Sequence, residues 1–488
     1  MMKSILLGNG INIQFGGQAY NNRFIMLRLV FNALADKYDS MFNEMISGKD
    51  IVSMFKGLLP TANSILTGKY DSLGIEDPEI IASISEFKEQ NKWRKHFENY
   101  YDVPIEDWLL LLRLFLIDNP DLDVEWVAAK QGFERIILDA IYNDGDIQDI
   151  HNKMDKKARR KIKHYLTSFD NIFTLNYDNN IEALTGRKVY HLHGEYSVPA
   201  DSENPETVQG FLRSQSGTLV TIPGFEHCYC NALLNYSGSL KYKQAADLMK
   251  YNELLKEFTE LNKSDTLMYE LRKMNLVSQI PDFTQIIDTY IEHPELKGST
   301  DYHFTDFENL SGELHIIGLA PQNDGHIFAC IERSHIDKVY FYYFGNPPKN
   351  LPLKKSYEFK TVEELWESLD CTRKTYNCNR KLPASDKVDS FFKLFNNLSF
   401  DPISKEEAIS EANSIPDFVA KPLCEKAVKL MESPKLSEPT KSEDEFFKRF
   451  RELSRIALRE GILPTAFFLL LICFIGLNSR TDQAINHK

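Results

Sequence analysis

A short apolar run that ends at a glycine turn constrains the fold of this chain more than any other feature. Residues 5–7 are Ile-Leu-Leu, the run stops at Gly8, and Gly10 follows two positions later. The pattern predicts a buried strand that feeds a tight turn, where backbone N–H groups approach a pyrophosphate and the next helix presents its positive N-terminus. A structural turn at the edge of an α/β sheet explains this segment equally well. Ile13 stands where G-x-G-x-x-G requires its third glycine, which disfavours a standard dehydrogenase.

Two polar side chains follow a second strand-like segment. Residues 171–175 have the composition of a strand, and Asn176 and Asp178 come after it. Open α/β sheets bind ligands at the carboxyl ends of their strands, so we expect both side chains to contact a ligand. The alternative for Asp178 is a turn that caps a helix beginning near Asn179 or Asn180.

A histidine pair marks a third segment. Residues 189–194 have strand-like periodicity, which places His191 and His193 on one face, and Gly194 follows directly. Histidine suits a general base because its ordinary pKa is close to neutrality. The glycine favours His193 as the base, but the pattern leaves His191 open, and a purely structural histidine is the alternative for either.

A fourth segment, residues 313–320, is another strand that ends in a glycine, Gly318. Gly318 would let a ribose or adenine ring lie against the backbone, and Asp324 is placed to cap the helix that follows. Residues 338–344 then form an aromatic, β-branched strand. All these segments predict an α/β fold with a Rossmann-like parallel sheet.

The ordered set of segments resembles the sirtuin superfamily, and more closely its divergent bacterial branch of phage-defence proteins, which includes AbiH-like proteins. In that family a G-x-G-x-S turn binds the phosphates of NAD, and residues 8–12 are similar, with Asn12 in place of the serine. The other matches are the T-x-N-x-D segment at 174–178, the His-Gly pair at 193–194 and the late glycine loop at 318–320. The nucleotide-binding residues that we predict are Gly8, Asn9, Gly10, Asn12, Thr174, Gly194, Gly318 and Asp324.

The resemblance implies an NAD+ hydrolase that cleaves the bond between nicotinamide and ribose. In this interpretation Asn176 orients a water molecule or the ribose hydroxyls, Asp178 holds the nicotinamide carboxamide and His193 is the general base. The family also implies an effector of anti-phage defence that depletes NAD+, a homo-oligomer, and a HerA-like ATPase or a phage-derived trigger protein as partner. An NAD or ADP-ribose sensor without turnover is the alternative.

One departure from the family concerns zinc. Sirtuin deacylases carry two cysteine pairs soon after the His-Gly strand, whereas this chain offers Cys228 and Cys230 beside His227 and no fourth ligand nearby. We therefore expect no metal. The chain also has no recognisable channel for an acyl-lysine peptide, so hydrolysis is favoured over deacylation or ADP-ribosyl transfer.

Composition restricts the compartment and the partners. The 57 basic and 70 acidic side chains give a net charge of −13, which disfavours direct nucleic-acid binding; we interpret the basic stretch 156–163 as a solvated helix face or a contact with an acidic partner. Seven irregularly spaced cysteines predict a cytoplasmic protein. The apolar stretch 462–477 is shorter than the ~20 residues of a membrane span. It predicts a core helix or an oligomer contact, with a membrane anchor as the alternative.

A chain of 488 residues exceeds what one hydrophobic core usually supports. We predict a sirtuin-like NAD-binding domain at 1–350, with large helical insertions at about 22–165 and 231–296. A mainly α-helical C-terminal domain at 351–488 would serve oligomerisation or sense a partner.

Overall fold

The computed structural model describes residues 2–42, 46–71, 74–121, 126–217, 221–279, 283–371, 403–432 and 443–485. Its centre is a six-stranded parallel sheet with the strand order β3-β2-β1-β4-β5-β6. The strands are β1 (Lys3–Leu7), β2 (Asn171–Thr174), β3 (Tyr190–His191), β4 (Ser311–Ile317), β5 (His335–Tyr343) and β6 (Ser356–Thr361). From the adjacent strands β1 and β4, the later strands are added outward on opposite sides, so the strand order switches between β1 and β4, as in Rossmann-like folds. The predicted fold class is therefore confirmed.

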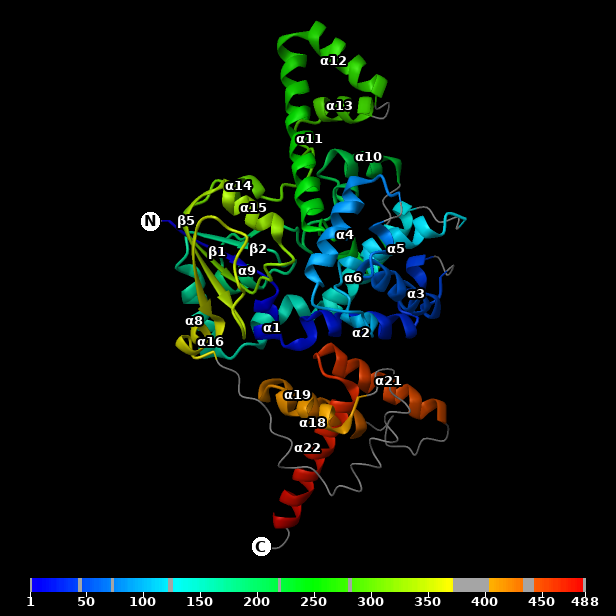
Figure 1. Ribbon diagram of the computed structural model, residues 1–488, viewed down its shortest axis with the longest axis vertical. Coiled ribbons are helices and arrows are strands. Elements are labelled where there is room, and N and C mark those ends of the chain that lie inside the picture. Colours follow the sequence, from blue (N-terminus) through cyan, green and yellow to red (C-terminus); the bar gives the residue numbers. More distant parts are fainter. Residues whose placement is uncertain are drawn as a thin grey trace.

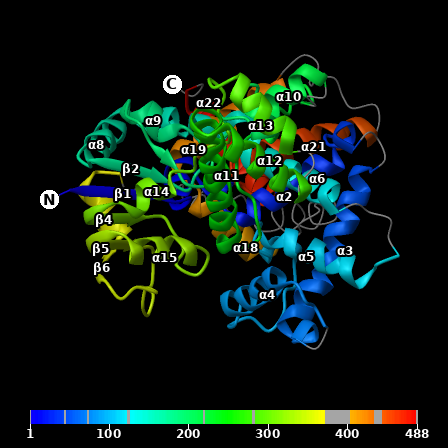
Figure 2. The same ribbon diagram turned by 90° about the horizontal axis from the view of Figure 1, so that it is seen from above.

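Helices cover both faces of the sheet, because successive side chains of each strand point to opposite sides. Leu6 packs toward α14 (Phe304–Glu308) and α15 (Gly325–Arg333), whereas Ile5 and Leu7 pack toward α8 (Lys156–Thr167), α9 (Asn180–Thr185) and α16 (Val362–Ser368). Figure 2 shows α8 and α9 on one side of the strands and α15 on the other. Burial on both faces explains why β1 is apolar without alternation.

The first helical insertion lies between β1 and β2. Eight described α-helices lie between these two strands. They are α1 (Gly10–Gly16), α2 (Asn22–Leu34), α3 (Gly48–Leu66), α4 (Pro78–Gln90), α5 (Asp107–Asp118), α6 (Trp126–Tyr142), α7 (Ile150–Lys153) and α8 (Lys156–Thr167). Helix α2 is buried on two sides. Ile25 and Leu29 belong to the core of the insertion, and Phe24 and Leu27 belong to a separate core shared with the C-terminal helices.

The second insertion lies between β3 and β4. It contains α10 (Val208–Ser216), α11 (Gly238–Ser264), α12 (Thr266–Gln279) and α13 (Phe283–Glu292). Leu255 and Phe258 of α11 pack with Ile287 of α13 in a small core of their own. The far end of α11 projects from the rest of the molecule with α12 and α13, in green at the top of Figure 1.

The predicted domain boundary at 350 needs correction. Strand β6, which lies beyond residue 350, pairs in parallel with β5. Asp370, just after the end of α16, accepts a 2.5 Å hydrogen bond from Lys161 of α8. The sheet-bearing unit therefore extends to residue 371, and residues 347–355 connect two neighbouring strands. A proline- and lysine-rich loop between two strands has the same composition as a linker between two domains, so the sequence alone could not distinguish the loop from a linker.

The C-terminal helices form a separate layer that packs against α2 (Figure 1). They are α18 (Lys405–Ser414), α19 (Asp417–Glu432), α21 (Glu443–Arg459) and α22 (Pro464–Ile485). Leu469 and Leu470 of α22 are fully buried in the core that includes Phe24 and Leu27, so the apolar stretch 462–477 supplies a core helix. Among the described helices, none alone has the length and apolarity to cross a membrane; residues 450–459 and 464–474 reach both only as a pair bent by 99°.

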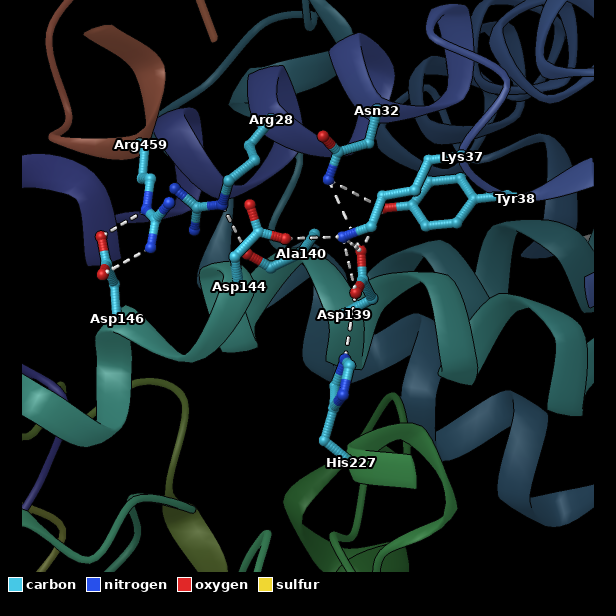
Figure 3. A network of polar contacts seen from close by, with 10 residues as sticks. All are labelled: Arg28, Asn32, Lys37, Tyr38, Asp139, Ala140, Asp144, Asp146, His227 and Arg459. Atoms are coloured by element: carbon cyan, nitrogen blue, oxygen red, sulfur yellow. Dashed lines mark hydrogen bonds and ion pairs between the residues drawn. The ribbon is translucent and has the colours of Figure 1, made fainter. Parts of the chain in front are cut away.

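A polar network joins these layers (Figure 3). Arg459 of α21 forms two hydrogen bonds, of 2.6 and 2.8 Å, to Asp146, and its carbonyl oxygen accepts a 2.9 Å bond from Asn143. Arg28 of α2 is buried and donates to the carbonyl oxygens of Ala140 at 2.7 Å and Ala19 at 3.1 Å. The bonds of Arg459 fix the C-terminal layer to η5 (Asn143–Asp149) of the first insertion.

A matched pair of leucine substitutions tests the C-terminal core. Leu470→Ala removes a fully buried side chain, and we expect it to lower the free energy of unfolding by about 2–5 kcal/mol. Leu267→Ala is the same change on α12, where the side chain is 73 % exposed, and should alter stability by no more than about 0.5 kcal/mol. Urea denaturation followed by circular dichroism measures both; equal effects would contradict the packing described.

Candidate active site at the carboxyl edge of the sheet

Two backbone turns touch where the strand order reverses. Leu7 is in register with both Thr174 and Ile317, so β1, β2 and β4 end at the same edge. The Gly8 N–H donates to the Ile317 carbonyl at 2.9 Å, and the Gly10 N–H donates to the Gly318 carbonyl at 2.9 Å. These two N–H groups are therefore not free to bind a pyrophosphate, which corrects the expectation from the sequence.

The three glycines of these turns are required by their contact with one another. A Cβ atom on Gly10 would lie 2.5 Å from the Gly318 Cα atom, and one on Gly8 would lie 2.4 Å from the Gly318 carbonyl oxygen. Gly318 also has a φ of 78°, a conformation that side chains other than glycine rarely adopt. The glycine pattern thus reflects close backbone packing.

A cavity of about 1060 Å³ opens beside these turns. Its volume is slightly above the usual range for small-molecule and cofactor sites, about 300–1,000 Å³. The wall is formed by the sheet edge, by η1 (Gln18–Tyr20), by α4 and α5, by the start of α11 and by the loop before α15. The predicted site residues that line it are Gly8, Asn9, Gly10, Asn12, Asn176, His193, Gly318 and Asp324.

Thr174 and Gly194 support the cavity wall from behind. The Thr174 hydroxyl donates to the Leu7 carbonyl at 3.1 Å and accepts the Asn176 N–H at 3.0 Å, which joins β1 to the turn after β2. Gly194 has a φ of 83°, and a Cβ atom there would lie 2.3 Å from the Asn231 carbonyl oxygen. Both residues position their neighbours and do not line the cavity.

Asp178 is buried behind Asn12. Its carboxylate accepts the Asn12 amide at 2.6 Å, the Asn180 N–H at 3.1 Å and the Asn180 side-chain amide at 2.5 Å. Burial raises the pKa of this carboxyl above its ordinary value, against the effect of the Asn12 and Asn180 bonds. Asp178 does not line the cavity, so the geometry gives no support to a direct contact with nicotinamide. The turn before α9 accounts for the residue.

The two histidines of the third segment point in different directions, because β3 ends at His191 and the pleat does not continue. His191 contacts Glu182 at 2.7 Å through Nε2 and the Asn176 carbonyl at 2.8 Å through Nδ1. Burial would lower the pKa of His191, but the bond to Glu182 raises it above the ordinary value. Both ring nitrogens of His191 are paired with acceptor oxygens, so neither is free to take a proton from water, and the geometry favours His193.

His193 faces a histidine that the sequence did not single out. The Nε2 atoms of His193 and His326 are 2.9 Å apart, and both rings are buried. Burial lowers the pKa of His193 well below its ordinary value and that of His326 to about 3. The sequence signal that was available is the Asp-Gly-His spacing from Asp324 to His326 at the start of a helix. It gave no indication that His326 meets His193.

Asp324 occupies the N-cap position of α15, as predicted, but its side chain makes no capping hydrogen bond. Its carboxylate lies instead beside the histidine pair, with one oxygen within 4.8 Å of a nitrogen on each ring. Burial raises the pKa of Asp324 to about 7. The carboxylate is therefore directed into the cavity.

Carboxylates from the first insertion form the opposite wall. Glu86 of α4, and Glu106 and Asp107 at the start of α5, line the cavity, and the buried Lys241 of α11 contacts Glu106 at 2.6 Å. The Asp107 Oδ2 atom is buried without a hydrogen-bond partner, and burial raises the pKa of this carboxyl well above 3.8. Sequence analysis missed these residues because nothing local distinguishes them from surface charges of a helix.

The cysteines considered for zinc lie elsewhere. Cys228 and Cys230 are buried in the core of the first insertion, and burial raises the pKa of Cys230 to about 11. The neighbouring His227 contacts Asp139 at 3.0 Å, and the Lys37 ammonium lies 2.8 Å from the same carboxylate (Figure 3). Lys37 already supplies the positive charge that a metal ion would bring.

The chain matches no protein-family model, no curated protein and no solved structure. Its function must therefore be argued from the cavity and from the residues that line it.

Two aspartate substitutions should have opposite effects on stability as the pH changes. The raised pKa of Asp107 means that its favourable contribution is present below about pH 3.8 and is lost as the pH rises through the folded-state pKa. Asp107→Asn should therefore unfold at a higher temperature than the native chain at pH 8, and this gain should disappear near pH 4.

Asp139 is the control with the opposite sign. Burial alone would raise its pKa, but the bonds from His227 and Lys37 hold it below the ordinary value, so its contribution is present at neutral pH and is lost in acid. Asp139→Asn should lower the unfolding temperature at pH 8 and still at pH 4, and its effect should shrink only as the pH falls further, through the folded-state pKa. Thermal unfolding at both pH values measures the pair; the same sign for both variants at pH 8 would contradict this account.

Proposed function

We propose that this protein hydrolyses NAD+ at the bond between nicotinamide and ribose, as an effector that depletes NAD+ in the manner of the defence proteins it resembles. One observation carries the proposal. A single large cavity at the strand-order reversal of a Rossmann-like sheet is lined by both Asn176 and His193. Dinucleotides bind at this place in folds of this class.

In this proposal His193 accepts the proton of the attacking water through Nδ1, because its Nε2 atom is paired with His326 at 2.9 Å. The water oxygen bonds to C1′ of the ribose as the bond from C1′ to nicotinamide breaks, and the electron pair of that bond neutralises the pyridinium nitrogen. The proton of the water passes to His193, and the products are ADP-ribose and nicotinamide. A positioned general base of this kind contributes on the order of 10²–10⁴ in rate.

Asn176 is held in place to orient the water or the ribose hydroxyls. Its Nδ2 group donates to the Gly8 carbonyl at 3.3 Å, and its backbone carbonyl accepts from His191 at 2.8 Å. The Oδ1 atom makes no hydrogen bond with a described residue, so it is available to a ligand. His191 thus positions Asn176 through this bond, while His193 carries out the proton transfer.

The acidic wall opposite the sheet edge supports a cationic ligand. Asp102 and Glu106 line the cavity, and of these two Lys241 contacts only Glu106. The nicotinamide ring of NAD+ carries a positive charge, whereas the reduced ring of NADH does not. Charge complementarity therefore favours the oxidised dinucleotide.

A second candidate function is an NAD or ADP-ribose sensor without turnover. Gln18 and Tyr20 of η1 line the cavity, and the same short helix touches the C-terminal layer. A Cβ atom on Gly461 would lie 2.0 Å from the Ala19 nitrogen, so any movement of η1 on ligand binding must be transmitted to residues around Gly461. This contact gives the sensor function a physical route.

Release of nicotinamide from NAD+ by the purified chain tests the proposal. His193→Gln should lower the rate by on the order of 10²–10⁴, and Asn176→Ala should reduce it strongly while the fold is retained. His303→Gln is the matched control, because His303 lies outside the cavity, before α14. Undiminished turnover in both cavity variants would refute the assignment. NAD+ binding without nicotinamide release under any condition would establish the sensor.

A further inference from the structure

His193 and His326 approach each other through nitrogen atoms that can each bind one proton or one metal ion. We infer that these two histidines, together with Asp324, form a binding site for one divalent transition-metal ion. The ligand atoms are one nitrogen of each imidazole and one carboxylate oxygen, and all three lie within 4.8 Å of one another. This set of donors arises from two distant parts of the chain, the turn after β3 and the first turn of α15.

The histidine geometry suits a shared ion. The Nε2 atoms are 2.9 Å apart, and the rings lie nearly parallel, with 20° between their planes. For bonds of about 2.0–2.1 Å, this separation corresponds to an angle of about 90° at a shared ion, and the two imidazoles would move apart by about 0.4 Å to reach the tetrahedral angle that zinc prefers. In the chain without metal, one N–H is donated to the other nitrogen. The ion replaces that proton.

Asp324 supplies the third donor because it serves no other described group. It stands at the N-cap position of α15, where an aspartate ordinarily accepts a backbone N–H, yet it makes no capping bond. Its carboxylate makes no hydrogen bond with a described residue. A negative group that forgoes its usual partner beside two imidazoles is placed for a cation.

The nearest fixed positive charge does not occupy the site. Lys241 is buried, and its ammonium group is held 2.6 Å from the Glu106 carboxylate. Asp139, His227 and Cys228 form another trio of possible ligands, but there a lysine contacts the carboxylate of the trio itself. There the Lys37 ammonium binds the carboxylate directly, at 2.8 Å.

Two imidazole donors determine the class of ion. Nitrogen ligands favour zinc, cobalt, iron or nickel over magnesium and calcium, which prefer oxygen. Two histidines and one carboxylate also leave coordination positions open, as in catalytic sites rather than structural ones. His193 and Asp324 line the cavity, so the open positions face the ligand space.

The site has one consequence for the reaction, and that consequence rests on the proposed function. An ion bound to the Nε2 atom of His193 leaves the ring proton on Nδ1, so no lone pair of this imidazole remains to accept the proton of water. Metal binding and general-base catalysis by His193 are therefore mutually exclusive, and the loaded chain is an inhibited state of the hydrolase.

Metal binding by the full-length chain, measured without NAD+, tests the site. After treatment with EDTA and dialysis, we expect the chain to bind one Co2+ or one Zn2+, followed by the visible absorption of Co2+ and by equilibrium dialysis of Zn2+. His326→Gln and Asp324→Asn should each weaken binding by at least about 100-fold. Circular dichroism of both variants establishes that they are folded.

His303→Gln is the control for adventitious surface binding, because Asp301, His303 and Asp306 form an exposed trio of similar composition. It should leave the affinity and the stoichiometry unchanged. If the native chain binds no ion, the inference is wrong. It is also wrong if binding survives both cavity substitutions and is lost in His303→Gln. The binding assay contains no NAD+, so its result does not depend on hydrolysis. A chain that binds the ion in this assay but releases no nicotinamide in the separate NAD+ assay would refute the hydrolase alone.

Discussion

The contact between two backbone turns, at Gly8–Gly10 and at Gly318, determines the geometry of the whole site. The turns lie within hydrogen-bonding distance because none of the three residues has a side chain, and a single Cβ atom on any of them would meet backbone. At this point the sheet order reverses, so the segments leaving β1 and β4 run to opposite faces. The space between them is the cavity. The sheet determines where the cavity lies, and the insertions supply many of the charged side chains in its wall.

Those side chains are costly for stability. Burial in a medium of low dielectric disfavours charge. The cavity wall contains carboxylates and His193, with Lys241 in contact with Glu106 and His326 in contact with His193. Asp107 retains a buried oxygen atom without a partner, and Asp324 gives up the capping bond of its helix. A fold selected for stability alone would not keep these groups. Their concentration in one cavity is what makes it the candidate for chemistry.

The remaining architecture connects this cavity to the C-terminal layer. Helix α2 contributes one face to the core of the first insertion and the other to the core built by α18, α19 and α22. Arg28 on the same helix binds the carbonyl oxygen of Ala19, in the short helix that lines the cavity. A change at either end must therefore repack α2 or break buried hydrogen bonds. This is the physical basis for expecting the C-terminal layer to sense the state of the cavity.

The sequence by itself determined the elements and their order. Apolar runs that stop at glycine or at polar residues predicted β1, β2 and β4 and the parallel sheet, because burial on both faces leaves a local signature. The tertiary structure decided which side chains meet. It separated His191 from His193, placed Asp178 behind Asn12, extended the sheet past residue 350 and brought His326 to His193. Sequence periodicity reports the local backbone and its burial, whereas contacts between residues more than a hundred positions apart depend on how the insertions pack.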